Sequence, residues 1–147
     1  MTRFFPFAAP ILTAGLLAAC SSESAEPVLA AGLFVGEGRD ALCIAGTRSA
    51  QRAGFIVYGA GPENCSVRGR VAYDGGKWAL VPSGEGECRI PFDVGGDRVA
   101  LGPAPAACAY YCGPGVAFAG KAFGRVDPSN AAATRAPMTD LAGDPLC

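Results

Sequence analysis

The stretch CSVRGRVAYDGGKWALV, residues 65–81, decides the fold because it has the pattern of two β-strands joined by a tight turn. Apolar and polar residues alternate along its first half, with Val67, Gly69, Val71 and Tyr73 on one face and Ser66, Arg68 and Arg70 on the other. A period of two is typical of a strand that buries one face. Asp74-Gly75-Gly76 is a hairpin signal, and Trp78 and Leu80 then return on a single face.

The segments on either side extend this pattern. Residues 88–101 predict a second hairpin, in which Cys88, Ile90, Phe92 and Val94 alternate with Glu87, Arg89, Pro91 and Asp93 before a turn at Gly95-Gly96-Asp97. Upstream, residues 55–58 are apolar at every position, which indicates a strand buried on both faces. We therefore predict a mainly β domain over residues 33–124. It is an antiparallel meander that forms a sandwich or a small barrel, with its last strand at residues 116–123.

One short helix is predicted inside this domain, near residues 105–112. Pro105 suits the first turn of a helix, and Gly113-Pro114 stops it. Two turns are too few for a helix that is stable by itself, so we expect Cys108 and Cys112 to staple it to the sheet through disulfides.

The first residues of the chain carry a targeting signal. Arg3 precedes an apolar run, residues 4–18, that suits a signal peptide and falls short of the ~20 residues that span a bilayer. The run ends in Leu17-Ala18-Ala19-Cys20, which resembles the lipobox of bacterial lipoproteins. The resemblance implies cleavage after residue 19, a lipid on the Cys20 thiol, and anchorage in the bacterial cell envelope. Ser21 stands where inner-membrane lipoproteins often have Asp, which favours the outer membrane.

Two segments are expected to lie outside the β domain. The lipidated Cys20 and the following residues to 32 are polar at first and contain a proline, so we interpret residues 20–32 as a tether to the membrane. Residues 125–147 are rich in Ala, Pro and Asp and poor in large apolar residues. We predict an extended C-terminal tail there, pinned to the domain by a disulfide through Cys147.

The cysteine count fits an oxidising compartment. With Cys20 assigned to the lipid, six of the seven cysteines remain, and they predict three disulfides among Cys43, Cys65, Cys88, Cys108, Cys112 and Cys147. On a helical turn, Cys108 and Cys112 have Cβ atoms too far apart for a ~3.8 Å bridge, so we exclude a bond between them. Of the 15 connectivities that six cysteines allow, twelve stay open.

Composition excludes several classes of site. The chain contains no histidine, which excludes Ser-His-Asp triads, Cys-His dyads and His-ligated zinc. Removal of Arg3 with the signal leaves eleven Lys and Arg against thirteen Asp and Glu. Arg68, Arg70 and Lys77 are interleaved with apolar residues and form no basic patch in the sequence. We therefore expect no nucleic-acid partner, and no motif predicts a metal or another cofactor.

The segment SGEGECR, residues 83–89, is the part of the chain that most resembles a site. We interpret Ser83, Glu85, Glu87 and Arg89 as a partner-binding loop. Alternatively, Glu85 and Glu87 could form the acid/base pair of a carboxylate-based, glycan-active enzyme. The pattern GEGRDA at residues 36–41 and the Cys108/Cys112 pair lack the βαβ context of a dinucleotide site or a redox pair. We interpret them as a turn and as structural cysteines.

Ser83-Gly84-Glu85-Gly86 is also similar to the Ser-Gly-x-Gly loop of the lipoprotein inhibitors of c-type lysozyme. That resemblance implies a small disulfide-containing β-barrel in which Ser83 enters the lysozyme active cleft. Our prediction from the sequence is a membrane-anchored envelope lipoprotein that acts as a non-enzymatic binding module for an envelope protein or a glycan. A lysozyme-inhibitor-like protein and a glycan-active enzyme are the alternatives.

Overall fold

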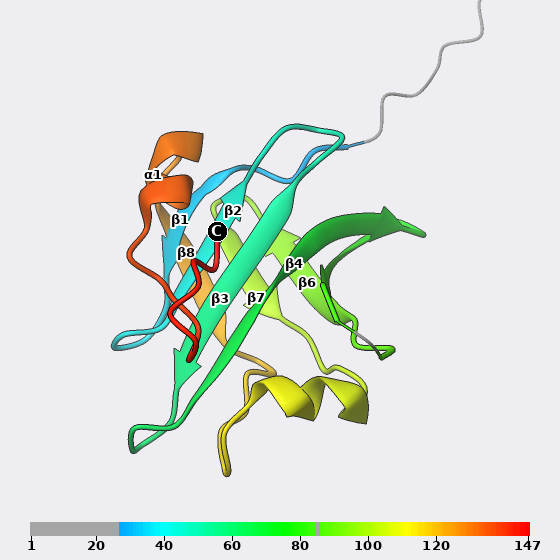
Figure 1. Ribbon diagram of the computed structural model, residues 1–147. Coiled ribbons are helices and arrows are strands. Elements are labelled where there is room, and N and C mark those ends of the chain that lie inside the picture. The colour runs from blue at the N-terminus through cyan, green and yellow to red at the C-terminus, as the bar shows by residue number, and fades with distance from the viewer. Residues whose placement is uncertain (1–26, 85) are drawn as a thin grey trace, which may run out of the picture.

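Eight antiparallel strands follow one another in chain order around a closed barrel in this computed structural model, which describes residues 27–84 and 86–147 (Figure 1). They are β1 (Gly32–Val35), β2 (Ala41–Ala45), β3 (Arg52–Tyr58), β4 (Asn64–Asp74), β5 (Lys77–Pro82), β6 (Ile90–Gly95), β7 (Arg98–Leu101) and β8 (Ala122–Asp127). Each strand pairs with the next, and β8 pairs with β1. This confirms the antiparallel β meander, closed as a barrel without a free sheet edge.

The alternation places most side chains of residues 65–81 as the sequence predicts, but Tyr73, which was predicted on the buried face, is 40% exposed next to the turn. Val67 and Leu80 are buried inside the barrel, whereas Arg68 and Arg70 are exposed on its outer face. Tyr73 pairs with Trp78 and Asp74 with Lys77 around the predicted hairpin turn. Gly75 and Gly76 both have positive φ there, a conformation that glycine adopts without steric cost.

Large apolar side chains fill the interior of the barrel. The fully buried ones include Phe34, Phe55, Phe123, Leu42, Ile44, Leu80, Ile90, Leu101, Val57, Val67 and Val99. They belong to one continuous cluster. An eight-stranded barrel is just wide enough for side chains to fill it. The lumen is therefore a packed core, and ligand binding has to use the outer surface.

The segment that precedes β1 closes one end of this core. Leu29 is 2% exposed and packs in the interior cluster. Its backbone is held by the buried side chain of Gln51, whose Oε1 accepts from the Leu29 amide at 3.0 Å and whose Nε2 donates to the Leu29 carbonyl at 2.6 Å. The predicted tether, residues 20–32, is therefore not a spacer along its whole length, because its last part is built into the barrel.

The last predicted strand is displaced along the chain. Residues 116–123 were expected to form it, but β8 begins at Ala122 and continues to Asp127, beyond the predicted domain boundary at residue 124. Residues 102–121 form the long β7–β8 connection instead, with Gly115 and Gly120 at positive φ. Backbone turns at these two glycines prevent an extended run before residue 122.

The C-terminal segment is only partly extended. Residues Asn130–Arg135 form the short helix α1, which the composition of the tail did not predict. Ser129 caps it, because its Oγ accepts from the Ala132 amide at 3.0 Å. Hydrogen bonds from the side chain and backbone of Ser129 also hold the pKa of the Asp127 carboxyl below its ordinary value. The hydrogen bonds of Ser129 and Asp127 fix the direction in which the chain leaves the barrel after β8.

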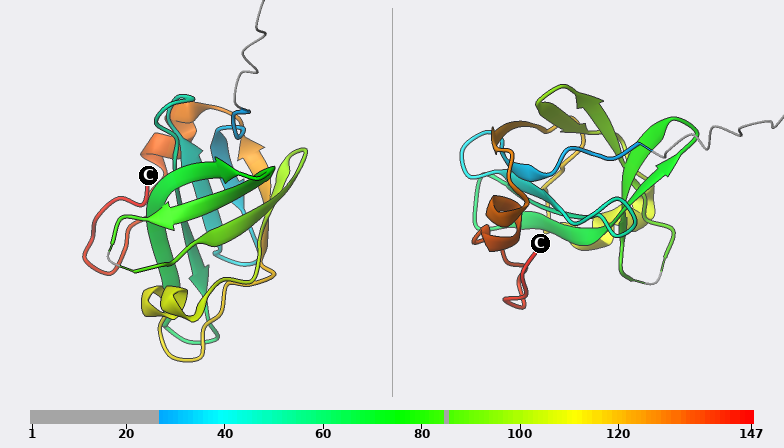
Figure 2. Two further views of the ribbon diagram at one scale, coloured as in Figure 1. Left: turned by 90° about the vertical axis from the view of Figure 1, so that its right-hand side faces the viewer. Right: turned by 90° about the horizontal axis from the view of Figure 1, so that it is seen from above.

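This segment, residues 128–147, lies against the outside of the barrel, as Figure 2 shows from two sides. We call it the C-terminal tail. Its buried residues Ala133, Met138 and Leu146 pack on Cys43, Ala45 and Ile56 of β2 and β3. A Cβ at Gly54 would lie 2.2 Å from the Leu146 carbonyl oxygen, so the tail sits directly on the β3 backbone. The strand at residues 55–58 is thus buried on both faces, as predicted.

Three disulfides resolve the open connectivities as Cys43–Cys147, Cys65–Cys112 and Cys88–Cys108. The tail is pinned through Cys147 as predicted, and Cys108 and Cys112 do not bond to each other. The short helix at residues 105–112 is the 3₁₀-helix η1 (Ala106–Tyr111). Its backbone bonds span three residues, from Cys108 to Pro105 and from Cys112 to Ala109.

Leu29→Ala is expected to lower the free energy of unfolding by about 2–5 kcal/mol, because it leaves a cavity at the end of the core. Val28→Ala is the matched control: the Val28 side chain is 44% exposed, so we expect a change within about 0.5 kcal/mol. Urea unfolding of the two variants measures the difference. Equal small losses would mean that residues 27–31 do not close the barrel.

Replacing both cysteines of a disulfide by serine is expected to lower the free energy of unfolding more when the two cysteines are further apart in the sequence. Cys43 and Cys147 are 104 residues apart, which corresponds to about 4.7 kcal/mol of chain entropy, whereas Cys88 and Cys108 are 20 apart, which corresponds to about 3.3 kcal/mol. Guanidinium unfolding of the two double variants tests this order. A larger loss for the Cys88–Cys108 variant would contradict the order that chain entropy predicts.

Candidate functional site

A groove crosses the outer face of the barrel between the β5–β6 loop and the C-terminal tail. It consists of two adjoining hollows of about 320 and 160 Å³, which share Arg68, Ser83 and Leu146. We call it the Ser83 groove. Its other lining residues are Arg52, Gly69, Arg70, Pro145 and Cys147 in the larger hollow, and Ser66, Tyr111 and Asp140 in the smaller one.

Two neighbouring strands bring three arginine residues to the larger hollow. Arg52 of β3 lies directly opposite Arg70 of β4, and Arg68 lies two residues before Arg70 on the same outward face. All three residues are exposed. Residues opposite each other in an antiparallel pair have Cβ atoms about 5 Å apart, and like charges at that spacing repel. The Arg52–Arg70 pair therefore costs stability.

Carboxylates compensate these charges unevenly. Arg68 pairs with the Asp144 carboxylate, with Nη2 and Oδ2 at 3.1 Å, and donates from Nη1 to the Pro145 carbonyl at 3.0 Å. Within residues 27–84 and 86–147, neither Arg52 nor Arg70 forms an ion pair. An anion between these two residues would relieve their repulsion and accept charge-assisted hydrogen bonds. The larger hollow thus has the chemistry of a carboxylate or phosphate site.

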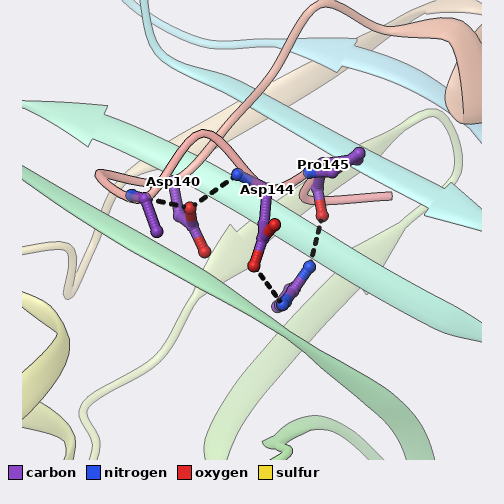
Figure 3. A network of polar contacts seen from close by, with 5 residues as sticks. Asp140, Asp144 and Pro145 are labelled. Carbon is purple, nitrogen blue, oxygen red and sulfur yellow. Dashed lines mark hydrogen bonds and ion pairs between the residues drawn. The ribbon is translucent and has the colours of Figure 1, made fainter.

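The wall of the groove on the tail side is a turn held by its own hydrogen bonds (Figure 3). Asp140 Oδ1 accepts from the Ala142 and Asp144 amides, both at 2.9 Å, and the Asp140 amide donates to the Asp144 carbonyl at 2.9 Å. The two contacts of Arg68 tie this turn to β4. Arg68 therefore positions the wall, whereas Arg52 and Arg70 form no such ion pair within residues 27–84 and 86–147.

The opposite wall consists of the β5–β6 loop and η1. Ser83 is exposed, and a Cβ at Gly84 would lie 2.9 Å from the Tyr111 hydroxyl, so the loop runs close to this ring. The Cys65–Cys112 and Cys88–Cys108 bonds fix both ends of η1. Ser66, Ser83 and Tyr111 bring hydroxyl groups to the smaller hollow, and each can donate and accept hydrogen bonds.

The residues of the predicted partner-binding loop do not all belong to this groove. Ser83 lines both hollows. Glu87 is exposed and Arg89 is half-buried at the start of β6, and neither lines either hollow. Glu85 lies outside the described residues, so its distance from Glu87 is not defined. The same holds for Cys20 and the rest of the lipobox.

The sequence did not predict the arginine cluster. Arg68 and Arg70 were interpreted as scattered charges, although their alternation with Val67 and Gly69 is what puts them on one face. Their partner Arg52 comes from another strand, and only the register of β3 with β4 brings it opposite Arg70. An Arg-x-Arg pattern in a half-buried strand was the available signal.

The other sequence patterns have structural roles. Residues 36–40 form the β1–β2 turn and Ala41 begins β2; in the turn the buried Asp40 carboxylate accepts from the Tyr58 amide at 2.9 Å and pairs with Lys121 at 3.4 Å. Cys108 and Cys112 are bonded to other cysteines. In residues 27–84 and 86–147, no group of three or more Asp, Glu or Cys residues could hold a metal ion. In the same residues, no helix has the length and hydrophobicity needed to cross a bilayer.

Comparison of the chain with protein-family models, with curated proteins and with solved structures found no match. The fold and the groove define a small, closed, disulfide-linked β-barrel with a packed lumen and a cationic surface groove.

Arg70→Gln is expected to raise the free energy of unfolding by a few tenths of a kcal/mol at low salt, because it removes the repulsion from Arg52. The gain should vanish in 1 M salt, where the screening length is about 3 Å. Arg98→Gln is the control, since Arg98 is exposed and faces Gly95 and Gly124 in the neighbouring strands. Urea unfolding at both salt concentrations checks this. A loss of stability with Arg70→Gln alone would identify Arg70 as a structural residue.

Proposed function

We propose that this protein is a lipid-anchored envelope lipoprotein that binds an acidic glycan in the Ser83 groove without chemical turnover. The observation that carries the proposal is the Arg52–Arg70 pair: two arginine residues that lie opposite each other, form no ion pair within residues 27–84 and 86–147, and line a hollow that adjoins the one lined by Ser66, Ser83 and Tyr111. An anionic ligand would supply the missing charge and relieve the repulsion between the two arginine residues.

A saccharide with a carboxylate or phosphate group matches the whole groove. Its anionic group would lie between Arg52 and Arg70, where guanidinium groups bind planar or tetrahedral anions through paired hydrogen bonds. Its hydroxyls would bond to the serine and tyrosine hydroxyls and to the Asp140 carboxylate in the smaller hollow. One face of a sugar ring is apolar and could pack on the half-buried Tyr111 ring.

The same contacts favour binding over catalysis. Asp140 and Asp144 hold the turn of the tail through hydrogen bonds and an ion pair. These carboxylates therefore position the groove wall. Glu87, one member of the acid/base pair proposed for a glycan-active enzyme, does not line the groove. With no histidine in the chain, the groove has the groups of a recognition site.

Anchorage follows from the lipobox resemblance at Leu17-Ala18-Ala19-Cys20. Two or three acyl chains on Cys20 would hold the protein at the membrane permanently, since each buried CH₂ contributes about 0.8 kcal/mol. The absence of Asp at position 21 favours the outer membrane as the location.

The test is a calorimetric titration of the mature chain, made unlipidated by Cys20→Ser, with envelope glycans and with the same glycans after reduction of their carboxyl groups. We expect binding of the acidic form only, weakened at least tenfold in the Arg52→Gln/Arg70→Gln variant and unchanged in Arg98→Gln. Equal binding of both glycan forms, or no effect of the double variant, would contradict the proposal.

A lysozyme-inhibitor-like role is the second candidate. It is favoured by the exposure of Ser83 and by the Tyr110 ring, which is 88% exposed on η1, beside the loop that Cys88–Cys108 holds. Exposed tyrosines are frequent anchors of protein interfaces. An activity assay of c-type lysozyme distinguishes the candidates. Inhibition that is lost in Tyr110→Ala and kept in Arg52→Gln/Arg70→Gln would favour a protein partner over a glycan as the ligand.

A further inference from the structure

A second hollow lies at the end of the barrel where the chain enters. Its volume is about 520 Å³, and its lining includes Pro27, Tyr73, Lys77, Trp78, Asp93 and Val94. We call it the aromatic cleft. It is formed by the β4–β5 hairpin, by β6, by Gly102 directly after β7 and by the segment that precedes Leu29. It shares no lining residue with the Ser83 groove.

Apolar surface is exposed around this cleft. Tyr73 and Trp78 lie opposite each other in β4 and β5, with their ring centroids 4.6 Å apart and the rings inclined at 51°. Trp78 is half-buried against the core, whereas Tyr73 is 40% and Val94 37% exposed. Val28, the residue after Pro27, is 44% exposed. Exposed apolar residues gathered at one place mark an interaction surface.

The order of the strands puts this surface and the Ser83 loop at opposite ends of the strands. In an up-and-down barrel, successive connections alternate between the two ends. The β4–β5 and β6–β7 turns lie at the end where the chain enters, together with Leu29. The β5–β6 loop with Ser83 and the helix η1 lie at the other end, and Gly102 after β7 is the part of the cleft lining nearest to them.

The distance between the cleft and the proposed anchor is limited by the chain. Cys20 and Pro27 are separated by seven residues, which span at most about 25 Å when fully extended. Because Pro27 lines the cleft, the cleft cannot lie further than this from an acylated Cys20. We propose that the aromatic cleft contacts the phospholipid headgroups of the membrane that holds the anchor. This inference rests on the lipid anchor of the proposed function.

The residues of the cleft match the chemistry of headgroups. Tryptophan and tyrosine favour the membrane–water interface because their rings combine an apolar body with a polar group. Lys77 is exposed and suits a lipid phosphate, since its stem can lie along the apolar surface while its ammonium group stays in water. Asp93 is also exposed and suits the ammonium group of phosphatidylethanolamine. Because Lys77 and Asp93 are charged, we expect the cleft to contact the headgroups and not to enter the acyl-chain region.

Trp78 is the single tryptophan of the chain, so its fluorescence reports on the cleft without any labelling. The lipidated full chain is reconstituted into vesicles of phosphatidylethanolamine and phosphatidylglycerol, with and without lipids brominated near the headgroup. We expect a blue-shifted emission and quenching by bromine, compared with the unlipidated Cys20→Ser chain in solution. Insertion of ten Gly and Ser residues between residues 25 and 26 should lower the quenching at least twofold.

Surface variants test the contact itself. Lys77→Glu/Val94→Ser should lower the quenching at least twofold, while Tyr110→Ser, on η1 at the opposite end, should leave it unchanged. Circular dichroism confirms that each variant is folded. Quenching that is the same in the cleft variant and in the control would overturn the proposal.

Flotation of the vesicles distinguishes failure of the anchor from failure of the contact. A chain that does not float with the vesicles overturns the proposed anchorage and this inference together. A chain that floats but shows no quenching overturns only the contact. A blue shift of the unlipidated chain on addition of soluble oligosaccharides, without quenching in vesicles, would instead identify the cleft as a saccharide site.

Discussion

The apolar outer face of β2 and β3 is the constraint on which the rest of this structure depends. A barrel of this kind ordinarily turns polar residues outward, but Cys43, Ala45 and Ile56 face outward here and have to be covered. The C-terminal tail covers them and is held there by Leu146 on Gly54 and by the Cys43–Cys147 bond. Once the tail lies along β3, its turn at Asp140 meets Arg68 and becomes one wall of a groove.

The sequence predicted what depends on neighbouring residues and missed what depends on register. The alternation around Val67 and Arg68 predicted a half-buried strand, and the apolar run at residues 55–58 a doubly buried one, because both patterns are local. No local sequence pattern indicates that Leu146 covers the outer face of β3. The position of Arg52 opposite Arg70 also depends on strand register and not on a local pattern. The displaced last strand and helix α1 depend on turns and caps at Gly115, Gly120 and Ser129, which the composition of the segment concealed.

The Ser83 groove combines parts that are distant in the sequence. Arg52, Arg70, Ser83, Tyr111 and the turn at Asp140 come from five separate segments, and disulfides hold two of those segments in place. Such a site is preorganised, so binding requires little ordering of the protein. Side chains fill the lumen of the barrel, so a ligand cannot enter it. The barrel therefore acts as a rigid support that presents its outer surface.

The order of pairing in the barrel also has a consequence for how the chain folds. Each strand pairs with its neighbour in sequence, so six of the eight ladders close loops of at most seven residues, and the β7–β8 ladder closes the twenty residues 102–121. The seam of β1 and β8 closes by far the longest loop, because it joins residues as far apart as Leu33 and Asp127. Loop closure across so many residues is entropically slow, whereas hairpins form in microseconds. The folding rate is thus expected to be set by a single late event, the meeting of the first and last strands.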